Sequence, residues 1–147
     1  MKALTVAEEL TALGRQLAKL PLDVYLGKLV LMGSIYGCLD AALTIAAILS
    51  SKSPFVTPLG HRKEAESCRL SFKRADSDLL TSWNAYSSWR RVCQRKTMMS
   101  ESEFCQRNYL SSRNLSGIEE LKQQLLVSVV EARFLTLKEE EKKELNR

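Results

Sequence analysis

The stretch that most constrains the fold is an apolar run from Leu29 to Leu49, in which the one charged residue is Asp40. A run of this length is long enough to cross a bilayer, but a carboxylate near the middle of a membrane helix costs about 3 kcal/mol. Gly33, Gly37 and Asp40 also form the pattern of one helix ending and another beginning. The run therefore predicts two short buried helices rather than a membrane span.

Caps and breakers place three helices in the first fifty residues. Pro21 ends the first helix, and Gly37 ends the second in the left-handed conformation of a C′ residue. The segment Ser51–Gly60 contains two prolines and a glycine and is expected to be a linker. Weak strand signals occur at Leu10–Thr11 and Arg133–Leu137. The predicted helices are 12–19 capped by Thr11, 24–36 capped by Asp23 and 41–50 capped by Asp40.

The second half is also predicted to be helical. Ser100-Glu-Ser-Glu103 has the spacing of a capping box, in which the serine hydroxyl accepts from the Glu103 amide. Lys138–Arg147 is a charged tail, expected to be frayed or helical but unpacked. The predicted helices are 61–75, 79–95 capped by Asp76 or Asp78, 101–110, and a last long helix that begins at Ser116.

Apolar residues that recur at helical spacing predict the core. The large aromatic residues among them are interpreted as core packing rather than as base-stacking platforms. Gly14 and Gly27 are expected to allow close helix approach. The predicted core positions are Leu26, Leu29, Val30, Gly33, Leu43, Ile45, Ile48, Leu49, Leu79, Trp83, Tyr86, Trp89, Cys93, Phe104, Ile118, Leu121, Leu125, Val129 and Ala132.

The formal charge of +5 on the 147 residues is unevenly spread. Residues 60–113 contain eleven Lys or Arg against six Asp or Glu, whereas residues 1–59 have five against four and residues 114–147 six against seven. A basic middle third predicts either a surface that faces a polyanion or a solvated face with no ligand. The length fits one domain or two very small ones.

Several kinds of chemistry lack the residues they need. No GxxxxGK[ST] phosphate loop occurs, and a single histidine, His61, provides no set for Ser–His or Cys–His catalysis. The four cysteines include no CxxC pair, so neither a structural zinc nor a disulfide-stapled domain is expected. Asp76 and Asp78 are more simply helix caps than a carboxylate pair. No signal peptide is recognised, and reduced thiols in the cytosol or nucleus are the default.

An ordered series of short motifs extends from Leu10 to Phe134. The first half contains LTALG at 10–14, LAKLPLD at 17–23, LGK at 26–28, YGCLD at 36–40, LTIAA at 43–47 and SSKSPF at 50–55. The second half contains SDLL at 77–80, NAY at 84–86, FCQRNYL at 104–110, RNL at 113–115 and QL at 124–125. In order and spacing, these motifs resemble the C-terminal helicase-associated region (HA2) of DEAH/RHA-type ATP-dependent RNA helicases.

The resemblance implies a mainly α fold of about six to seven helices, in which winged-helix-like helices precede a ratchet-like helical bundle. It implies a winged-helix-like part at residues 1–55, the bundle at 56–135 and a charged tail at 136–147. It implies no catalytic residue, metal or cofactor in this chain, and ATP with Mg²⁺ in the motor domains of a parent helicase. The implied partners are single-stranded RNA, the RecA-like motor domains, the following C-terminal domain and a protein cofactor. The implied location is cytoplasmic, or alternatively nuclear, with no membrane.

Motif position also implies which residues contact RNA, namely Asn108, Arg113 and Arg107. The charge distribution adds Arg90, Arg91, Lys73 and Arg74 as reserve candidates. Structural alternatives stand beside these roles. Asn108 would cap or brace neighbouring backbone, Arg113 would be the ion-pair partner of a helix end, and Arg90 and Arg91 would only be solvated.

Two functions stay open at this point. One is an RNA-channel module of a helicase, and the other is a protein-binding helical module that docks on motor domains or a cofactor protein without touching RNA. A free-standing winged-helix DNA binder is a third interpretation, against which the low charge of residues 1–59 counts.

Overall fold

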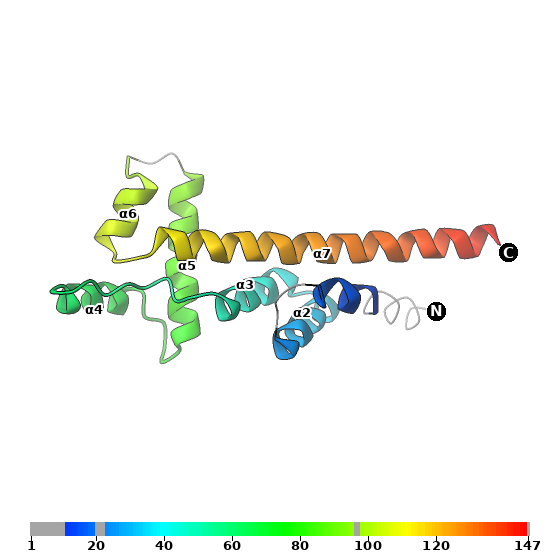
Figure 1. The fold of residues 1–147 in the computed structure, drawn as a ribbon, viewed down its shortest axis with the longest axis horizontal. Helices are drawn as coiled ribbons and strands as arrows, with labels where there is room; N and C mark the ends of the chain where they lie inside the picture. Colours follow the sequence, from blue (N-terminus) through cyan, green and yellow to red (C-terminus); the bar gives the residue numbers. More distant parts are fainter. Residues whose placement is uncertain (1–10, 20–22, 96–97, 147) are drawn as a thin grey trace. The chain divides into compact units, whose positions relative to one another are not determined.

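The computed structural model describes residues 11–19, 23–95 and 98–146, without the side chains of residues 134–137, 139 and 140. In this part of the chain the fold is mainly α, as predicted, and the only β pairing is an antiparallel bridge between Phe55 and Leu110. None of the helices described is long and apolar enough to cross a membrane. After a helical segment over residues 11–17, the order is α2 (Val24–Tyr36), α3 (Leu39–Ser50), α4 (Arg62–Ser71), α5 (Asp78–Gln94), α6 (Glu101–Arg107) and α7 (Ser112–Leu145) (Figure 1).

The helices form two compact units. The first unit takes in Met1–Ala46 and Leu121–Arg147, and the second unit takes in Ala47–Glu120. Helices α3 and α7 contribute residues to both units. All the candidate RNA-contact residues belong to the second unit. The division of the chain at residues 55 and 135 stays a prediction.

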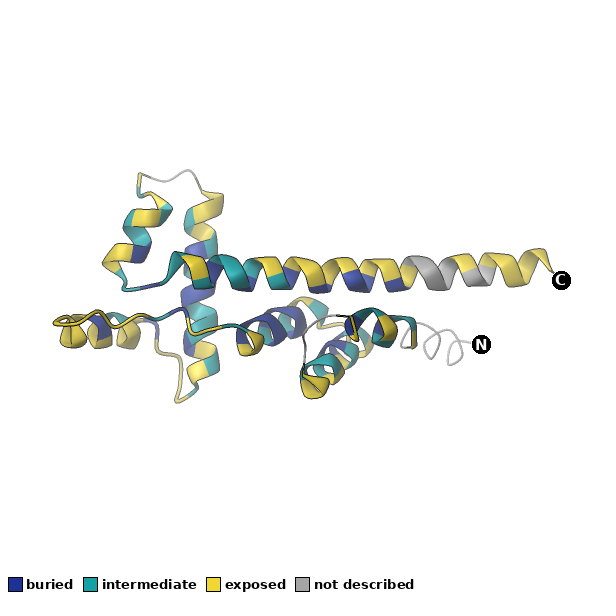
Figure 2. Cartoon of the chain, in the orientation of Figure 1, coloured by how far each residue is buried: buried dark blue, intermediate teal, exposed yellow. Residues whose placement is uncertain are grey.

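The first unit buries the apolar faces of the 11–17 segment, α2, α3 and α7. Along α7, buried residues recur every three or four positions, as a core-facing helix requires (Figure 2). Lys122 lies in this buried row, where its Nζ pairs with the Asp40 Oδ1 of α3 at 3.0 Å. The core cluster comprises Leu13, Leu17, Val30, Leu43, Ala46, Leu125, Val129 and Ala132.

Helix α2 starts and ends as the sequence predicts. The Asp23 side chain accepts a hydrogen bond from the Tyr25 amide at 3.1 Å, which satisfies one of the free N–H groups of the first turn. Gly37 ends the helix at φ 73°, in the left-handed conformation. The predicted division of the apolar run into two short helices is therefore confirmed, but α2 is not a buried helix, because only Val30 and Gly33 in it are buried.

Helices α2 and α3 approach closely at Gly33. A Cβ built there would overlap the Cβ of Ala42 and would lie 3.3 Å from the Cys38 carbonyl oxygen. Gly14 and Gly27, which the sequence suggested for close approach, have nothing within 4 Å of a Cβ. That prediction is wrong, and Gly33 is the position where a hydrogen is needed in place of a side chain.

Several predicted helix starts are also wrong. Asp40 lies inside the first turn of α3 rather than before it, because this helix begins at Leu39. Ser77 caps α5 in place of its two aspartate neighbours, since its extended backbone lets the hydroxyl accept from the Leu80 amide at 3.2 Å. Helix α7 begins four residues before Ser116. Thr11 is itself helical rather than a cap.

The helices predicted over 61–75 and 101–110 end early, at positions that precede left-handed backbone. Helix α4 stops four residues short and α6 three residues short. Ala75 and Tyr109 follow them with φ of 48° and 51°, which a right-handed helix cannot contain. Thr11 and Arg133–Leu137 are helical, so the weak strand predictions there are wrong, and Leu10 lies outside the described residues.

The second unit is built around α5. Tyr86 and Trp89 are buried, as predicted. Ser100 caps α6, as predicted, by accepting from the Glu103 amide at 3.2 Å. Among the predicted core residues of the whole chain, Leu49 and Cys93 are exposed, and those only half-buried are Leu26, Leu29, Ile45, Leu79, Trp83, Phe104 and Leu121.

Candidate nucleic-acid interface

The seven candidate residues fall into three groups on the second unit. The structure places them on the turn between α4 and α5, on the second half of α5, and around the connection from α6 to α7. These groups are Lys73 with Arg74, Arg90 with Arg91, and Arg107 with Asn108 and Arg113.

The α6–α7 connection carries the three residues implied by motif position. The Asn108 Nδ2 donates to the Phe104 carbonyl at 2.9 Å, so this side chain braces the end of α6. The Arg107 guanidinium pairs with the Glu103 carboxylate at 2.7 Å. Arg113 is exposed in the first turn of α7 and has no ion pair with any described residue. The structural alternative thus applies to Asn108 and not to Arg113.

Arg113 is unusual because of its place in the helix. The N-terminal end of a helix carries a partial positive charge, so a cation there is disfavoured by up to about 1 kcal/mol. No acid among the described residues compensates this arginine. An external anion would do so.

The loop at residues 51–60, predicted to be a linker, holds this connection in place. The Val56 amide donates to the Tyr109 carbonyl at 3.0 Å, and the Ser111 amide donates to the Pro54 carbonyl at 2.7 Å. The Asn114 Nδ2 adds a bond of 2.9 Å to the Ser53 carbonyl. The loop is therefore an anchored part of the second unit rather than a free linker.

Glu101 ties three helices together from the first turn of α6. Its Oε1 accepts from the Trp89 Nε1 at 3.1 Å and from the Ser112 hydroxyl at 2.7 Å. The first bond satisfies an indole N–H that α5 buries, and the second fixes the start of α7. The start of α7, and with it Arg113, is therefore positioned by a partly buried network of hydrogen bonds.

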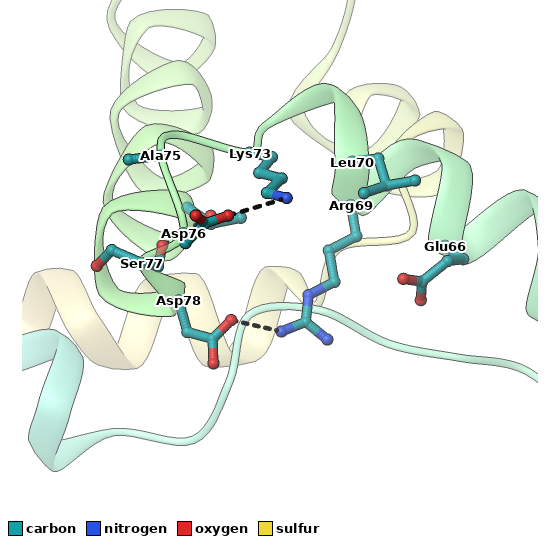
Figure 3. Close-up of a pocket in the computed structure, with 9 residues that line it drawn as sticks. Glu66, Arg69, Leu70, Lys73, Ala75, Asp76, Ser77 and Asp78 are labelled. Carbon is teal, nitrogen blue, oxygen red and sulfur yellow. Dashed lines mark hydrogen bonds and ion pairs between the residues drawn. The ribbon is translucent and has the colours of Figure 1, made fainter.

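The α4–α5 turn surrounds an open hollow of about 320 Å³ (Figure 3). Lys73 pairs with Asp76 at 3.4 Å, and Arg69 pairs with Asp78 at 3.2 Å. Figure 3 shows each of these cations directed to its aspartate. Glu66 also lines the hollow, so the carboxylates of the lining offset the charge of Arg69 and Lys73. This turn is less suited to a polyanion than the α6–α7 connection.

Replacing Ala75 by glycine is expected to stabilise the chain by about 0.5–1 kcal/mol. Ala75 is exposed and has φ 48°, where a Cβ is unfavourable and glycine is not. Chemical denaturation followed by circular dichroism measures the change. Ala18→Gly is the matched control at an exposed residue without positive φ, and a loss of stability is expected there. A loss at both positions would contradict the left-handed conformation of Ala75.

On α5, the two reserve arginines differ. The Arg90 Nε lies 3.9 Å from the Glu119 carboxylate, which also accepts from the Tyr86 hydroxyl. Arg91 is exposed and has no ion pair with a described residue. Arg90 therefore has an acidic neighbour, whereas the alternatives of RNA contact and simple solvation both stay open for Arg91.

The α5 and α6 cysteines, Cys93 and Cys105, both have raised thiol pKa values. Burial, with smaller contributions from the Glu101 carboxylate and Cys93, raises the pKa of the Cys105 thiol to about 11. Partial desolvation raises the pKa of the exposed Cys93 thiol, with contributions from Glu101 and Glu119. Both thiols are protonated near neutral pH, unlike a nucleophile or a metal ligand. No three His, Cys, Asp or Glu side chains in the described part of the chain are grouped as a metal site.

Sequence reasoning missed three features of this unit. Glu101 was seen only as part of a capping box, and Arg69 was not selected although its guanidinium lies 5.5 Å from the centre of the Phe55 ring. Tyr109 was seen only as part of a motif. Its neighbour His61 is 48 residues away in the sequence, so no local pattern could have paired them.

The fold and these contacts define a helical domain with a basic second unit, and comparison with known proteins gives its class. Residues 23–82 match the family described as "Helicase associated domain (HA2), ratchet-like". Residues 23–82 therefore carry an HA2 ratchet-like domain, and the resemblance of the motifs to the HA2 region of DEAH/RHA-type RNA helicases is confirmed.

Three curated relatives agree with this assignment. The chain is 44% identical over 126 residues to mouse (Mus musculus) ATP-dependent RNA helicase DHX29, covering 86% of this chain and 9% of the relative. It is 47% identical over 122 residues to human (Homo sapiens) putative ATP-dependent RNA helicase DHX57, covering 83% and 9%. It is 40% identical over 147 residues to bovine (Bos taurus) ATP-dependent DNA/RNA helicase DHX36, covering 99% and 14%. The chain thus spans a small part of the length of these relatives.

Proposed function

We propose that this chain is an accessory module of an ATP-dependent RNA helicase and that its second unit contacts single-stranded RNA. The observation that carries the proposal is Arg113, an exposed cation at a helix start, positioned by the Glu101 network and without an acidic partner among the described residues. Arg107 lies at the end of the preceding helix. Together they offer two cations at one connection to the phosphates of a strand.

The ion pair of Arg107 does not prevent this role. Its side chain is 64% exposed, and such surface pairs contribute about 0–1 kcal/mol. A phosphate can therefore replace Glu103 as the partner at little cost. Asn108 supports the same connection by bracing the backbone between the two arginines.

Titration of a fluorescent single-stranded RNA with the chain at several salt concentrations tests the proposal. Each phosphate contact adds about 0.7 to the slope of log Kobs against log salt concentration for single strands. Arg107→Ala and Arg113→Ala are each expected to weaken binding and to reduce this slope by about that amount. The measurement is fluorescence anisotropy.

Arg15→Ala is the control, because Arg15 is also exposed but belongs to the first unit. It is expected to leave the salt slope unchanged. Binding that is absent, or a slope that is the same in all variants, would contradict direct RNA contact.

The second candidate function is protein docking, favoured by the apolar surface of α2. Val24, Tyr25, Met32 and Ile35 are all between 47% and 77% exposed. A helix that is apolar on all sides is normally buried on all sides. We therefore propose α2 as the contact with the motor domains or with a cofactor protein.

At the level of the parent protein, the proposal is an ATP-dependent RNA helicase. ATP with Mg²⁺ belongs to its RecA-like motor domains, and the chain itself holds no cofactor in this proposal. The partners are single-stranded RNA, the motor domains and the following C-terminal domain. The proposed location is cytoplasmic, with the nucleus as the alternative.

A further inference from the structure

A second cavity, of about 420 Å³, lies beside α6 on the second unit. Val56, Pro58 and Leu110 give it apolar walls, and Tyr109 contributes an aromatic side chain. Polar groups come from Glu101 and Gln106. The cavity thus combines apolar surface with a few polar groups, as sites for small cyclic ligands do.

Tyr109 is held at this cavity by its backbone and by a histidine. Its φ of 51° is unfavourable for a residue with a side chain, and the hydrogen bond from the Val56 amide to its carbonyl maintains it. The Tyr109 hydroxyl lies 3.4 Å from the His61 Nδ1, and the two ring centres are 6.0 Å apart. The ring is only half-buried, so it is not a core residue.

The lining of the cavity selects against phosphate. Among the described residues that line it there is no lysine or arginine, while the Glu101 carboxylate does line it. A phosphate would be repelled there, whereas a flat neutral ring with polar edges is compatible with both the apolar walls and the carboxylate. A nucleobase has this chemistry.

Two cations follow residues that line the cavity. Arg107 directly follows the lining residue Gln106, and Arg113 directly follows the lining residue Ser112. Adjacent residues have Cα atoms about 3.8 Å apart, so the backbone of each arginine lies next to the lining. Two cations beside the lining and an aromatic side chain within it match the phosphates and the base of one nucleotide.

We propose that this cavity binds one base of single-stranded RNA, stacked on Tyr109, while Arg107 and Arg113 contact the flanking phosphates. This inference rests on the proposed function and adds to it a site for the base. Stacking on an aromatic side chain is tolerant of sequence, because every base has a π face.

The test compares a single-stranded RNA with an oligonucleotide of equal length that has the same backbone but abasic sugars. Tyr109→Asn removes the ring and keeps a residue that tolerates left-handed backbone. It is expected to weaken RNA binding about 5- to 100-fold and to leave binding of the abasic strand unchanged. Leu59→Asn, at a fully exposed residue of the same loop as Val56, is the control.

A second variant covers the case in which Tyr109→Asn fails to fold. Val56 is at the cavity and 36% exposed, so Val56→Trp fills the cavity without entering the core. It is expected to cause the same selective loss, whereas Leu59→Trp is not.

The outcomes separate the two proposals. Salt-sensitive binding that is equal for RNA and abasic strands overturns the base site and leaves the RNA contact in place. Binding of neither strand overturns both. RNA affinity unchanged by Tyr109→Asn and Val56→Trp would overturn this inference.

Discussion

Leu125→Ala is expected to lower the free energy of unfolding by about 2–5 kcal/mol. Leu125 of α7 is 0% exposed and belongs to the core cluster of the first unit, to which α2 and α3 also contribute residues. Truncation removes buried methyl groups and leaves a cavity whose walls relax only in part. Chemical denaturation followed by circular dichroism at 222 nm measures the loss, with the 147-residue chain and no partner.

The neighbouring Leu126 provides the control, because it has the same side chain on the same helix but is 38% exposed. Leu126→Ala is expected to change the free energy of unfolding by no more than about 0.5 kcal/mol. Equal losses at both positions would contradict the assignment of Leu125, rather than Leu126, to the buried face of α7.

The buried face of α7 could be predicted because it depends on a local periodicity. Leu125, Val129 and Ala132 recur at helical spacing, and all three are buried in the structure. Lys122 occupies the same row and is also buried, but its charge excludes it from any prediction based on apolar pattern. Its burial depends on Asp40, which lies 82 positions earlier in the chain.

Helix caps were predicted less well for a related physical reason. Asp40, Ser77 and the two aspartates beside Ser77 all have side chains that can accept from a backbone amide. Which of them caps a helix depends on the conformation of that one residue, and Ser77 is the extended one. Asp40 is instead committed to Lys122. The sequence offered Asp76 or Asp78 for α5, and the backbone conformation of Ser77, which the sequence does not show, makes this serine the cap.

For the candidate site, the sequence could predict which residues belong to it but not which side chains and backbone groups they contact. Motif spacing selected Arg107, Asn108 and Arg113, and the structure brings these three to one connection. The roles differ, because Asn108 braces backbone while Arg113 has no partner among the described residues. The pairing of Tyr109 with His61 needed the fold, since it joins the α6–α7 connection to the loop before α4.

Gly33→Ala is expected to destabilise the chain by about 1–3 kcal/mol, although alanine is normally the better helix former. The added Cβ would overlap the Ala42 Cβ, which is attached directly to backbone and cannot rotate away. Helices α2 and α3 would have to separate, and the Cys38 carbonyl at 3.3 Å restricts that movement. Urea denaturation measures the change.

Two further variants make this prediction specific to the contact. Gly27 lies on the same helix with nothing within 4 Å, so Gly27→Ala is expected to stabilise the chain by about 0.5–1 kcal/mol. In the double variant Gly33→Ala/Ala42→Gly, the methyl group moves from α3 to α2 and the overlap is removed. The loss in free energy of unfolding is therefore expected to be smaller than the sum of the losses in the two single variants. Additive losses in that cycle would show that Gly33 is required for some reason other than its approach to Ala42. A coupling of about 1 kcal/mol or more would establish the close α2–α3 contact as the reason for glycine there.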